Sequence, residues 1–173
     1  MVEETFVQKF ATILADQRSI DKKEAFSIAE DFKTRSKESL VYFLIDEGLV
    51  PKDDILKALS RYFNIPSFDA QGYFFDNSLV GMFPVEFLTS NGIIPMSLEQ
   101  GIMTVVASDP DQSGLRARIM EYTDADIEFV VGIKRDIWDA AREYSQKSLT
   151  AENTAEEEEE IGQDESVVDE EAI

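Results

Sequence analysis

The chain has 173 residues, of which 43% are hydrophobic, enough to bury the core of one or two small domains. It contains no cysteine and no histidine, which excludes disulfides, thiolate metal sites and the commonest catalytic base. The net charge of −20 argues against binding to nucleic acid or directly to anionic lipid. No apolar run approaches the ~20 residues that span a bilayer, so we expect a cytoplasmic protein without direct membrane insertion.

The amino-terminal part of the chain contains a stretch that occurs twice, 30 residues apart. Residues 44–59 are echoed, more loosely, by residues 14–29. The matching pairs are Leu14 and Leu44, Asp16 and Asp46, Ile20 and Val50, Lys22 and Lys52, and Phe26 and Leu56. Self-similarity at a fixed period indicates one helical unit used twice. We therefore predict a helical lobe of two degenerate repeats over residues 1–63.

Each repeat reads as helix, loop, helix. In the first repeat the apolar side chains at helical spacing are Phe6, Phe10, Ile13 and Leu14, followed by Ala25, Phe26, Ala29 and Phe32. In the second they are Leu40, Phe43 and Leu44, followed by Ile55, Leu56, Leu59, Tyr62 and Phe63. Gly48 follows the last turn of the third helix, where a left-handed residue is needed, and Pro51 suits the first turn of the fourth.

Residues 64–146 are predicted to form a small sheet with helices packed on it, which makes the fold class α+β. The segment 67–77 has the composition of an extended loop. Ser78 is expected to begin a helix that Phe83-Pro84 interrupts, and Asn91-Gly92 marks the end of the next helix.

The strands of this lobe are expected in its second half. The β-rich runs 93–96 and 102–107 predict a hairpin, with Pro95 on an edge strand. Residues 108–111 predict a turn and the start of a helix with Leu115, Ile119 and Tyr122 on its apolar face. A strand over 127–131 should then lie parallel to the second strand, after a right-handed crossover. A closing helix carries Ile133, Ile137, Trp138, Ala141 and Tyr144.

Acidic charge is concentrated at the carboxyl end. Residues 151–173 carry 11 acidic side chains and no basic one, which leaves a net charge of −9 for the first 150 residues. Such a segment cannot bury enough apolar surface to offset the entropy lost on folding. We predict that residues 147–173 form a disordered acidic linker or tail.

The residue types offer no catalytic set. No Gly-Lys-Ser or Gly-Lys-Thr occurs, so a phosphate-binding loop of the P-loop class is excluded for this chain. The aspartates Asp109, Asp111, Asp124 and Asp126 fall where turns are expected and are explained by turn geometry. We predict no catalytic residue, no metal site and no cofactor.

An unusual aromatic cluster, Tyr73-Phe74-Phe75, falls in the predicted loop. Three adjacent aromatic side chains in a loop either pack over the sheet or form a contact patch for a partner.

Residues 40–146 resemble the N-terminal domain of the assembly ATPases of type II secretion and type IV pili (the GspE/PilB family). The resemblance is carried by an ordered set of short pieces with matching gaps. They are Leu44-Ile-Asp-Glu-Gly-Leu-Val50, Ile55-Leu-x-x-Leu59, Phe63-Asn-Ile-Pro66, Phe68-Asp69, Phe83-Pro-x-x-Phe87-Leu88, Ile94-Pro95, Met103-Thr-Val-Val-Ala-Ser-Asp-Pro110 and Ile127-Glu-Phe-Val-Val131.

The resemblance implies a non-catalytic domain that docks on the cytoplasmic domain of an inner-membrane secretion or pilus assembly protein. The domain would thus be peripheral to the inner membrane through its partner, and it would be joined to an ATPase motor domain if the chain is part of a longer protein. We expect Tyr73, Phe74 and Phe75 to lie at the centre of the docking surface.

The alternative implied by the resemblance is a cyclic di-GMP sensor, because some family members bind this nucleotide with the tandem helical repeat. The candidate positions here are Lys9, Arg18, Leu40, Leu44, Gly48 and Leu59. Gly48 and the leucines fit that subfamily, but Ser39 stands where it has Arg, Tyr62 where it has Gln, and Arg18 where the first repeat has Gly. Ser cannot replace the bidentate fork of Arg, so we expect binding to be lost or weak.

Overall fold

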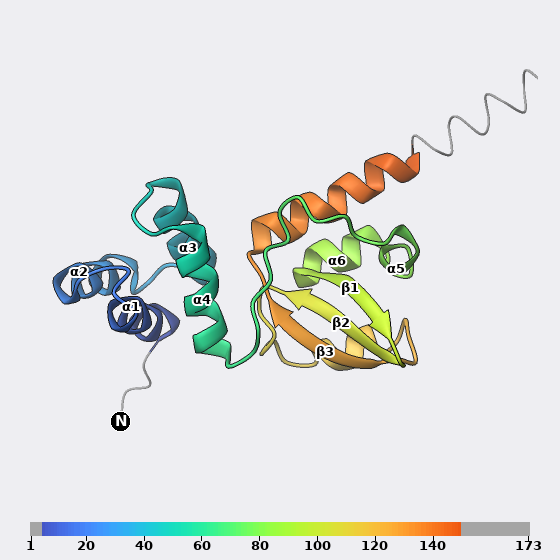
Figure 1. The fold of residues 1–173 in the computed structure, drawn as a ribbon, viewed down its shortest axis with the longest axis horizontal. Coiled ribbons are helices and arrows are strands. Elements are labelled where there is room, and N and C mark those ends of the chain that lie inside the picture. Colours follow the sequence, from blue (N-terminus) through green and yellow to red (C-terminus); the bar gives the residue numbers. More distant parts are fainter. Residues whose placement is uncertain (1–4, 150–173) are drawn as a thin grey trace, which may run out of the picture.

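A computed structural model of the chain describes residues 5–149 and shows a helical lobe followed by a sheet lobe (Figure 1). The helical lobe consists of α1 (Phe6–Asp16), α2 (Lys22–Phe32), α3 (Lys37–Asp46) and α4 (Lys52–Phe63). Both predicted helix–loop–helix repeats are therefore confirmed. The acidic segment from residue 150 onward lies outside the described residues.

Side-chain caps begin three of the four helices of this lobe. Thr5 and Asp21 each form a reciprocal capping box, with Gln8 and Glu24 respectively. These pairs satisfy backbone N–H groups that the first turn of a helix leaves free. α3 begins at Ser36, whose hydroxyl accepts from the Ser39 N–H at 3.2 Å. α4 instead begins after Pro51 without a side-chain cap.

The sheet has three strands, β1 (Ile93–Glu99), β2 (Ile102–Ala107) and β3 (Asp126–Val131), in that order. β1 and β2 are antiparallel, whereas β2 and β3 are parallel, which confirms the predicted hairpin and the predicted parallel pair. Pro95 lies on the edge strand β1, as expected. β1 is longer than predicted, so the hairpin turn contains only Gln100 and Gly101, both with positive φ.

The remaining elements are short helices and one long one. They are α5 (Asn77–Val80), α6 (Val85–Asn91), α7 (Leu115–Ile119) and a C-terminal helix whose described part is residues 134–149. α6 and the C-terminal helix lie on the same side of the sheet (Figure 1). No helix within the described residues is long and apolar enough to cross a membrane.

Two predicted helix starts are wrong. Asp76, not Ser78, caps α5, because its carboxylate accepts the Ser78 N–H at 2.9 Å. α7 begins at Leu115 after the left-handed Gly114, not at 108–111, where the Gln112 N–H closes a turn on the Asp109 carbonyl.

The predicted apolar faces are largely confirmed, with Phe26 the clearest exception. Its side chain is 70% exposed, while Ala25, Ile28 and Phe32 make the buried face of α2. Phe43 and Tyr122 also lie at the surface. α2 packs chiefly against α1, and Phe32 at its end also contacts Phe43 of α3.

Each lobe has its own buried apolar cluster, but the clusters are not fully separate. The helical cluster includes Val131 at the end of β3 and Ile133 just beyond it. α4 packs against β3 as well as against α1 and α3. The two lobes are therefore joined by apolar contact along α4.

Candidate functional site

The aromatic patch, defined as Tyr73, Phe74 and Phe75, lies in the connection between α4 and α5. Tyr73 makes edge-on contacts with Phe68 and Phe75, with ring centroids 5.0 Å and 4.8 Å apart. Phe68 and Phe75 pack on the core of the sheet lobe, whereas Phe74 is 90% exposed. The base of the patch thus covers the sheet lobe, as one of the two expectations had it, and its tip, Phe74, is exposed to solvent.

The patch borders a hollow of about 310 Å³ beside the C-terminal helix. Ala140, Tyr144 and Lys147 of that helix also line the hollow. Lys147 is held by an ion pair with Glu143 at 2.9 Å. An apolar side chain next to a hollow with a polar margin is the composition expected of a protein contact surface.

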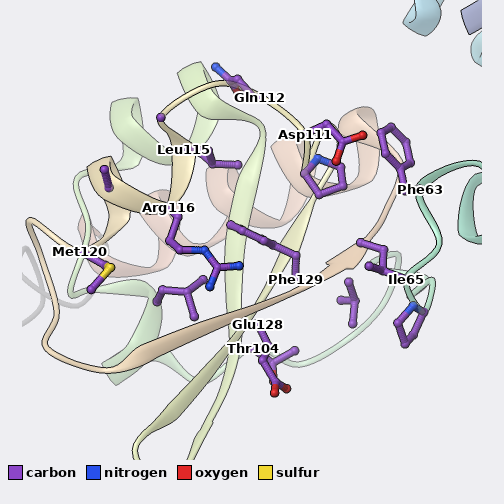
Figure 2. Close-up of a pocket in the computed structure, with 16 residues that line it drawn as sticks. Phe63, Ile65, Thr104, Asp111, Gln112, Leu115, Arg116, Met120, Glu128 and Phe129 are labelled. Carbon is purple, nitrogen blue, oxygen red and sulfur yellow. The ribbon is translucent and has the colours of Figure 1, made fainter.

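A larger groove of about 870 Å³, which sequence reasoning did not predict, lies over β3 and α7 (Figure 2). Arg116 reaches over the ring of Phe129, with its guanidinium carbon 5.5 Å from the ring centroid. Met120 is 48% exposed beside them. The charged lining residues Asp111, Arg116 and Glu128 are exposed, so the groove presents apolar surface edged by both signs of charge.

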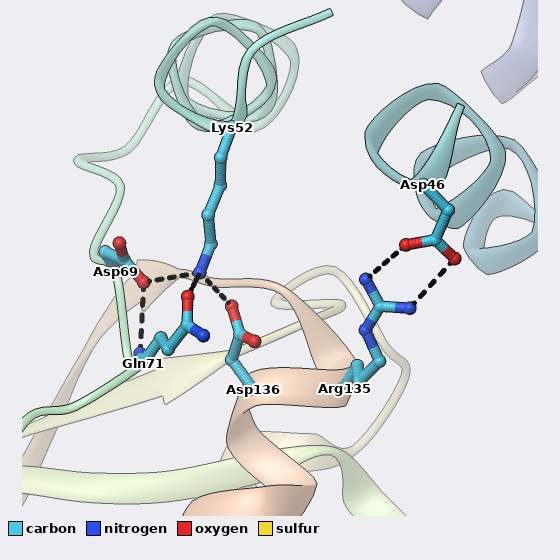
Figure 3. Close-up of polar contacts among 6 residues, drawn as sticks. All are labelled: Asp46, Lys52, Asp69, Gln71, Arg135 and Asp136. Carbon is cyan, nitrogen blue, oxygen red and sulfur yellow. Dashed lines mark hydrogen bonds and ion pairs between the residues drawn. The ribbon is translucent and has the colours of Figure 1, made fainter. Parts of the chain in front are cut away.

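The joint between the lobes is built around Lys52, the first residue of α4 (Figure 3). Its ammonium lies 2.9 Å from Asp69, 2.7 Å from Asp136 and 2.7 Å from the Gln71 side-chain oxygen. Burial alone would lower the pKa of Lys52, but Asp136 and Asp69 outweigh it and raise that pKa above 10.5. A single cation therefore ties α4 to a loop and to the C-terminal helix.

A second ion pair crosses the joint close by. The Arg135 guanidinium donates to both carboxylate oxygens of Asp46, at 3.1 and 2.9 Å (Figure 3). The same guanidinium lies over the Tyr42 ring. This hydrogen bonding lowers the pKa of Asp46 and raises that of Arg135. The two side chains are 41% and 55% exposed, so this bridge contributes little to stability.

Lys37, at the start of α3, makes a third connection. Its ammonium donates to the Ser108 carbonyl and lies over the rings of Phe63 and Phe6, at 4.8 and 5.6 Å from their centroids. Burial lowers the pKa of Lys37, with Lys134 adding to that effect and Asp109 opposing it. The carbonyl and the rings replace part of the hydration that the ammonium loses.

The structure separates the six candidate nucleotide-binding residues. Leu40, Leu44 and Leu59 lie in the core of the helical lobe, with 0%, 0% and 2% exposure. Gly48 and Arg18 occupy equivalent turns and share a left-handed backbone, with φ of 66° and 63°. The turn geometry is thus kept in the first repeat even where Arg replaces Gly, although a side chain is strained there.

Lys9 lies apart from both turns. It lines a shallow hollow of about 420 Å³ with Thr12, Arg61, Tyr62 and Asp111, near the end of α4. The α1–α2 turn is instead attached near the start of α4, where the Ser19 hydroxyl donates to the Asp54 carboxylate at 3.1 Å. Lys9 and Arg18 are consequently placed toward opposite ends of α4.

Comparison with known proteins identifies the fold. The model of the MshEN domain matches residues 63–151. The chain belongs to the MshEN domain family. No curated protein sequence matches it.

Two solved structures resemble this MshEN domain. The structure of MshE with cdg has 16% identity and a TM-score of 0.57, covering 78% of this chain and 97% of that one. The N-terminal domain of XpsE has 18% identity and a TM-score of 0.55, covering 82% and 97%. The 78% and 82% of this chain that are covered exceed the length of the sheet lobe, so the shared fold includes the helical lobe. The expected resemblance to the N-terminal domains of GspE/PilB-type ATPases is confirmed.

The sequence indicated the aromatic patch of this MshEN domain but neither the lobe joint nor the groove. The joint unites Lys52 with Asp69 and Asp136, which are far apart in the sequence. The repeat matches Lys52 with Lys22, but this match does not indicate which acidic residues contact Lys52. The only signal for the groove was the pair Ile127 and Phe129, whose alternation places both on one face of β3.

Proposed function

We propose that this MshEN domain is the non-catalytic docking domain of a type II secretion or type IV pilus assembly ATPase. Its partner is a cytoplasmic domain of an inner-membrane assembly protein, and this contact keeps it peripheral to the membrane. Family membership supports the ATPase class. The observation that carries docking is the 90% exposure of Phe74 on a packed aromatic base.

The aromatic patch offers apolar surface on a loop that is held by ring contacts. Burying a phenylalanine side chain contributes about 1.5–3 kcal/mol, and aromatic residues often dominate protein interfaces. Contacts of Tyr73 with Phe68 and Phe75 hold the loop that presents Phe74. A loop that is already held in place loses less backbone entropy on binding than a flexible one.

The test is binding of the chain to the isolated cytoplasmic domain of the assembly protein. We expect Tyr73→Ser with Phe74→Ser to weaken binding at least ~10-fold, because the double change removes the exposed ring and its support. Phe74→Ser alone should give most of that loss. Titration calorimetry measures both affinities.

Leu98→Ser is the matched control, since Leu98 is also an exposed apolar residue, at 43%, but lies on β1. It should leave the affinity unchanged. Equal binding by the wild type and the Tyr73/Phe74 variant would remove the aromatic patch as the docking surface.

The second candidate is a cyclic di-GMP sensor that uses the tandem helical repeat. It is favoured by the shared fold with MshE, whose structure was determined with cdg, and by the left-handed turns kept at Arg18 and Gly48. Of the candidate residues, Lys9 and Arg18 supply exposed positive charge. The buried leucines would support a site from beneath.

Calorimetry with cyclic di-GMP distinguishes the two candidates. We expect weak binding or none, because Ser39 and Tyr62 replace the side chains that hold the nucleotide in the binding subfamily. Measurable heat that Arg18→Ala and Lys9→Ala both abolish would establish the sensor. An absence of heat and of a thermal shift at millimolar nucleotide would exclude it.

A further inference from the structure

The outward side of the first repeat carries the most exposed aromatic residue of the helical lobe. Phe26, on α2, is 70% exposed. It stands at the margin of a hollow of about 520 Å³ between α1 and α2, whose floor contains Ala11, Ala15 and Ala29. α2 lies at the end of the molecule farthest from the sheet, so neither the sheet nor the C-terminal helix covers this side (Figure 1).

The second repeat shows what the equivalent positions do when they are covered. Lys22 and Phe26 correspond to Lys52 and Leu56, 30 residues later. There, Lys52 pairs with carboxylates of the sheet lobe and Leu56 is only 7% exposed. The first repeat therefore retains a cation and a large apolar side chain at positions that the second repeat uses for contact, but no element of the sheet lobe lies beside α2.

The charges around Phe26 are arranged so that the surface complements itself. Lys22 lies four residues before Phe26 and Glu30 four residues after it, and both line the same hollow. Residues four apart share a face of a helix. If two copies of α2 pack antiparallel about a two-fold axis at Phe26, each Lys22 meets the Glu30 of the other copy.

We propose that α2 is a self-association surface whose occupant is a second copy of this chain. Each Phe26 inserts between α1 and α2 of the other copy, over the alanines that leave room for a ring. The two Lys22–Glu30 pairs fix the antiparallel orientation. An isologous contact of this kind is self-complementary and closes as a dimer. It lies in the helical lobe and is separate from the proposed docking function of the aromatic patch.

The test is sedimentation equilibrium of the full chain between about 5 and about 500 µM, a range suited to a small, weak interface. About 0.15 M salt is needed because two copies of charge −20 repel one another at low ionic strength. The wild type should approach twice the monomer mass with rising concentration. Phe26→Asp should weaken association at least ~100-fold, because both copies lose an apolar contact and gain an unpaired charge.

Leu49→Asp is the matched control, because Leu49 is 50% exposed and lies in the α3–α4 connection. It should associate like the wild type. The exposure of Phe26 and Leu49 means that both variants should fold, and circular dichroism checks this directly.

A charge exchange tests the orientation itself. Lys22→Glu should weaken association about 5- to 10-fold by placing like charges opposite each other. Lys22→Glu with Glu30→Lys should restore it to within about threefold, since the pairs re-form with opposite sign. Within one chain these residues are about 12 Å apart along the helix, so the rescue cannot arise there. Glu30→Lys also removes an exposed ion pair with Lys33, which contributes little.

Three results would overturn the proposal. The first is a wild type that stays monomeric at every concentration, which would point to a different protein or to no partner for Phe26. The second is unchanged association of Phe26→Asp. The third is an exchange variant that associates no better than Lys22→Glu, which excludes the antiparallel arrangement.

Discussion

Lys52→Met is expected to lower the free energy of unfolding by about 2 kcal/mol at neutral pH. The variant keeps an apolar stem but leaves Asp69 and Asp136 without their shared cation. Asp136 is the more costly of the two, because only 11% of its side chain is exposed. Breaking a fully buried ion pair costs ~3–5 kcal/mol, and the lower figure here reflects the 22% exposure of Lys52. Urea unfolding measures the change.

The double variant Lys52→Met with Asp136→Asn should recover most of this loss, since it also removes the unpaired charge. Asp46→Asn, which breaks the exposed bridge to Arg135, is the control and should change stability little. Because the pKa of Lys52 is raised, its contribution is fully present below pH 10.5 and disappears as the pH rises through the raised pKa. The Met variant should lack this alkaline loss. A Lys52→Met protein as stable as the wild type would show that the joint does not depend on this cation.

Leu44→Ala is expected to lower the free energy of unfolding by about 3 kcal/mol or more. Leu44 has no exposed surface, so the change removes apolar contacts and leaves a cavity within the helical lobe. The effect should appear without any nucleotide, because the residue supports the core. Urea unfolding of the ligand-free chain measures it.

Leu49→Ala is the control of the same residue type, with 50% of its surface exposed, and should cost less than about 0.5 kcal/mol. Because both variants are unfolded by urea without nucleotide, a difference between them reports on the core and not on ligand binding. A Leu44→Ala chain that kept the wild-type stability would mean that Leu44 contributes little to the core, contrary to its burial.

The sequence was most informative where local chemistry decides the structure. The repeat, the apolar spacing, Gly48 and Pro51 predict α1 to α4 because turns and helix ends are decided by chemistry within a few residues. Pro95 and the β-rich runs predict the hairpin for the same reason. The helix start near residue 108 was wrong because turns over Asp109 to Gly114 delay the helix to Leu115.

Tertiary position decided the features that the sequence could not reveal. Phe26 and Leu56 occupy equivalent places in the repeat, yet one is exposed and the other buried. α4 is covered on two sides, by the other helices and by β3, whereas α2 is covered chiefly by α1. Periodicity identifies an apolar face but not how many neighbours cover it. The acidic partners of Lys52 also depend on how the two lobes pack, so the sequence alone could not predict them.

The two ionic bridges of the joint end on adjacent residues, Arg135 and Asp136, in the first turn of the C-terminal helix. A tilt of the helical lobe must therefore either break these bridges or turn the start of that helix with it. The described helix continues to residue 149, about 20 Å beyond the bridges at 1.5 Å per residue. Any rotation of the first turn of this helix would therefore move residue 149 farther than it moves the two bridges.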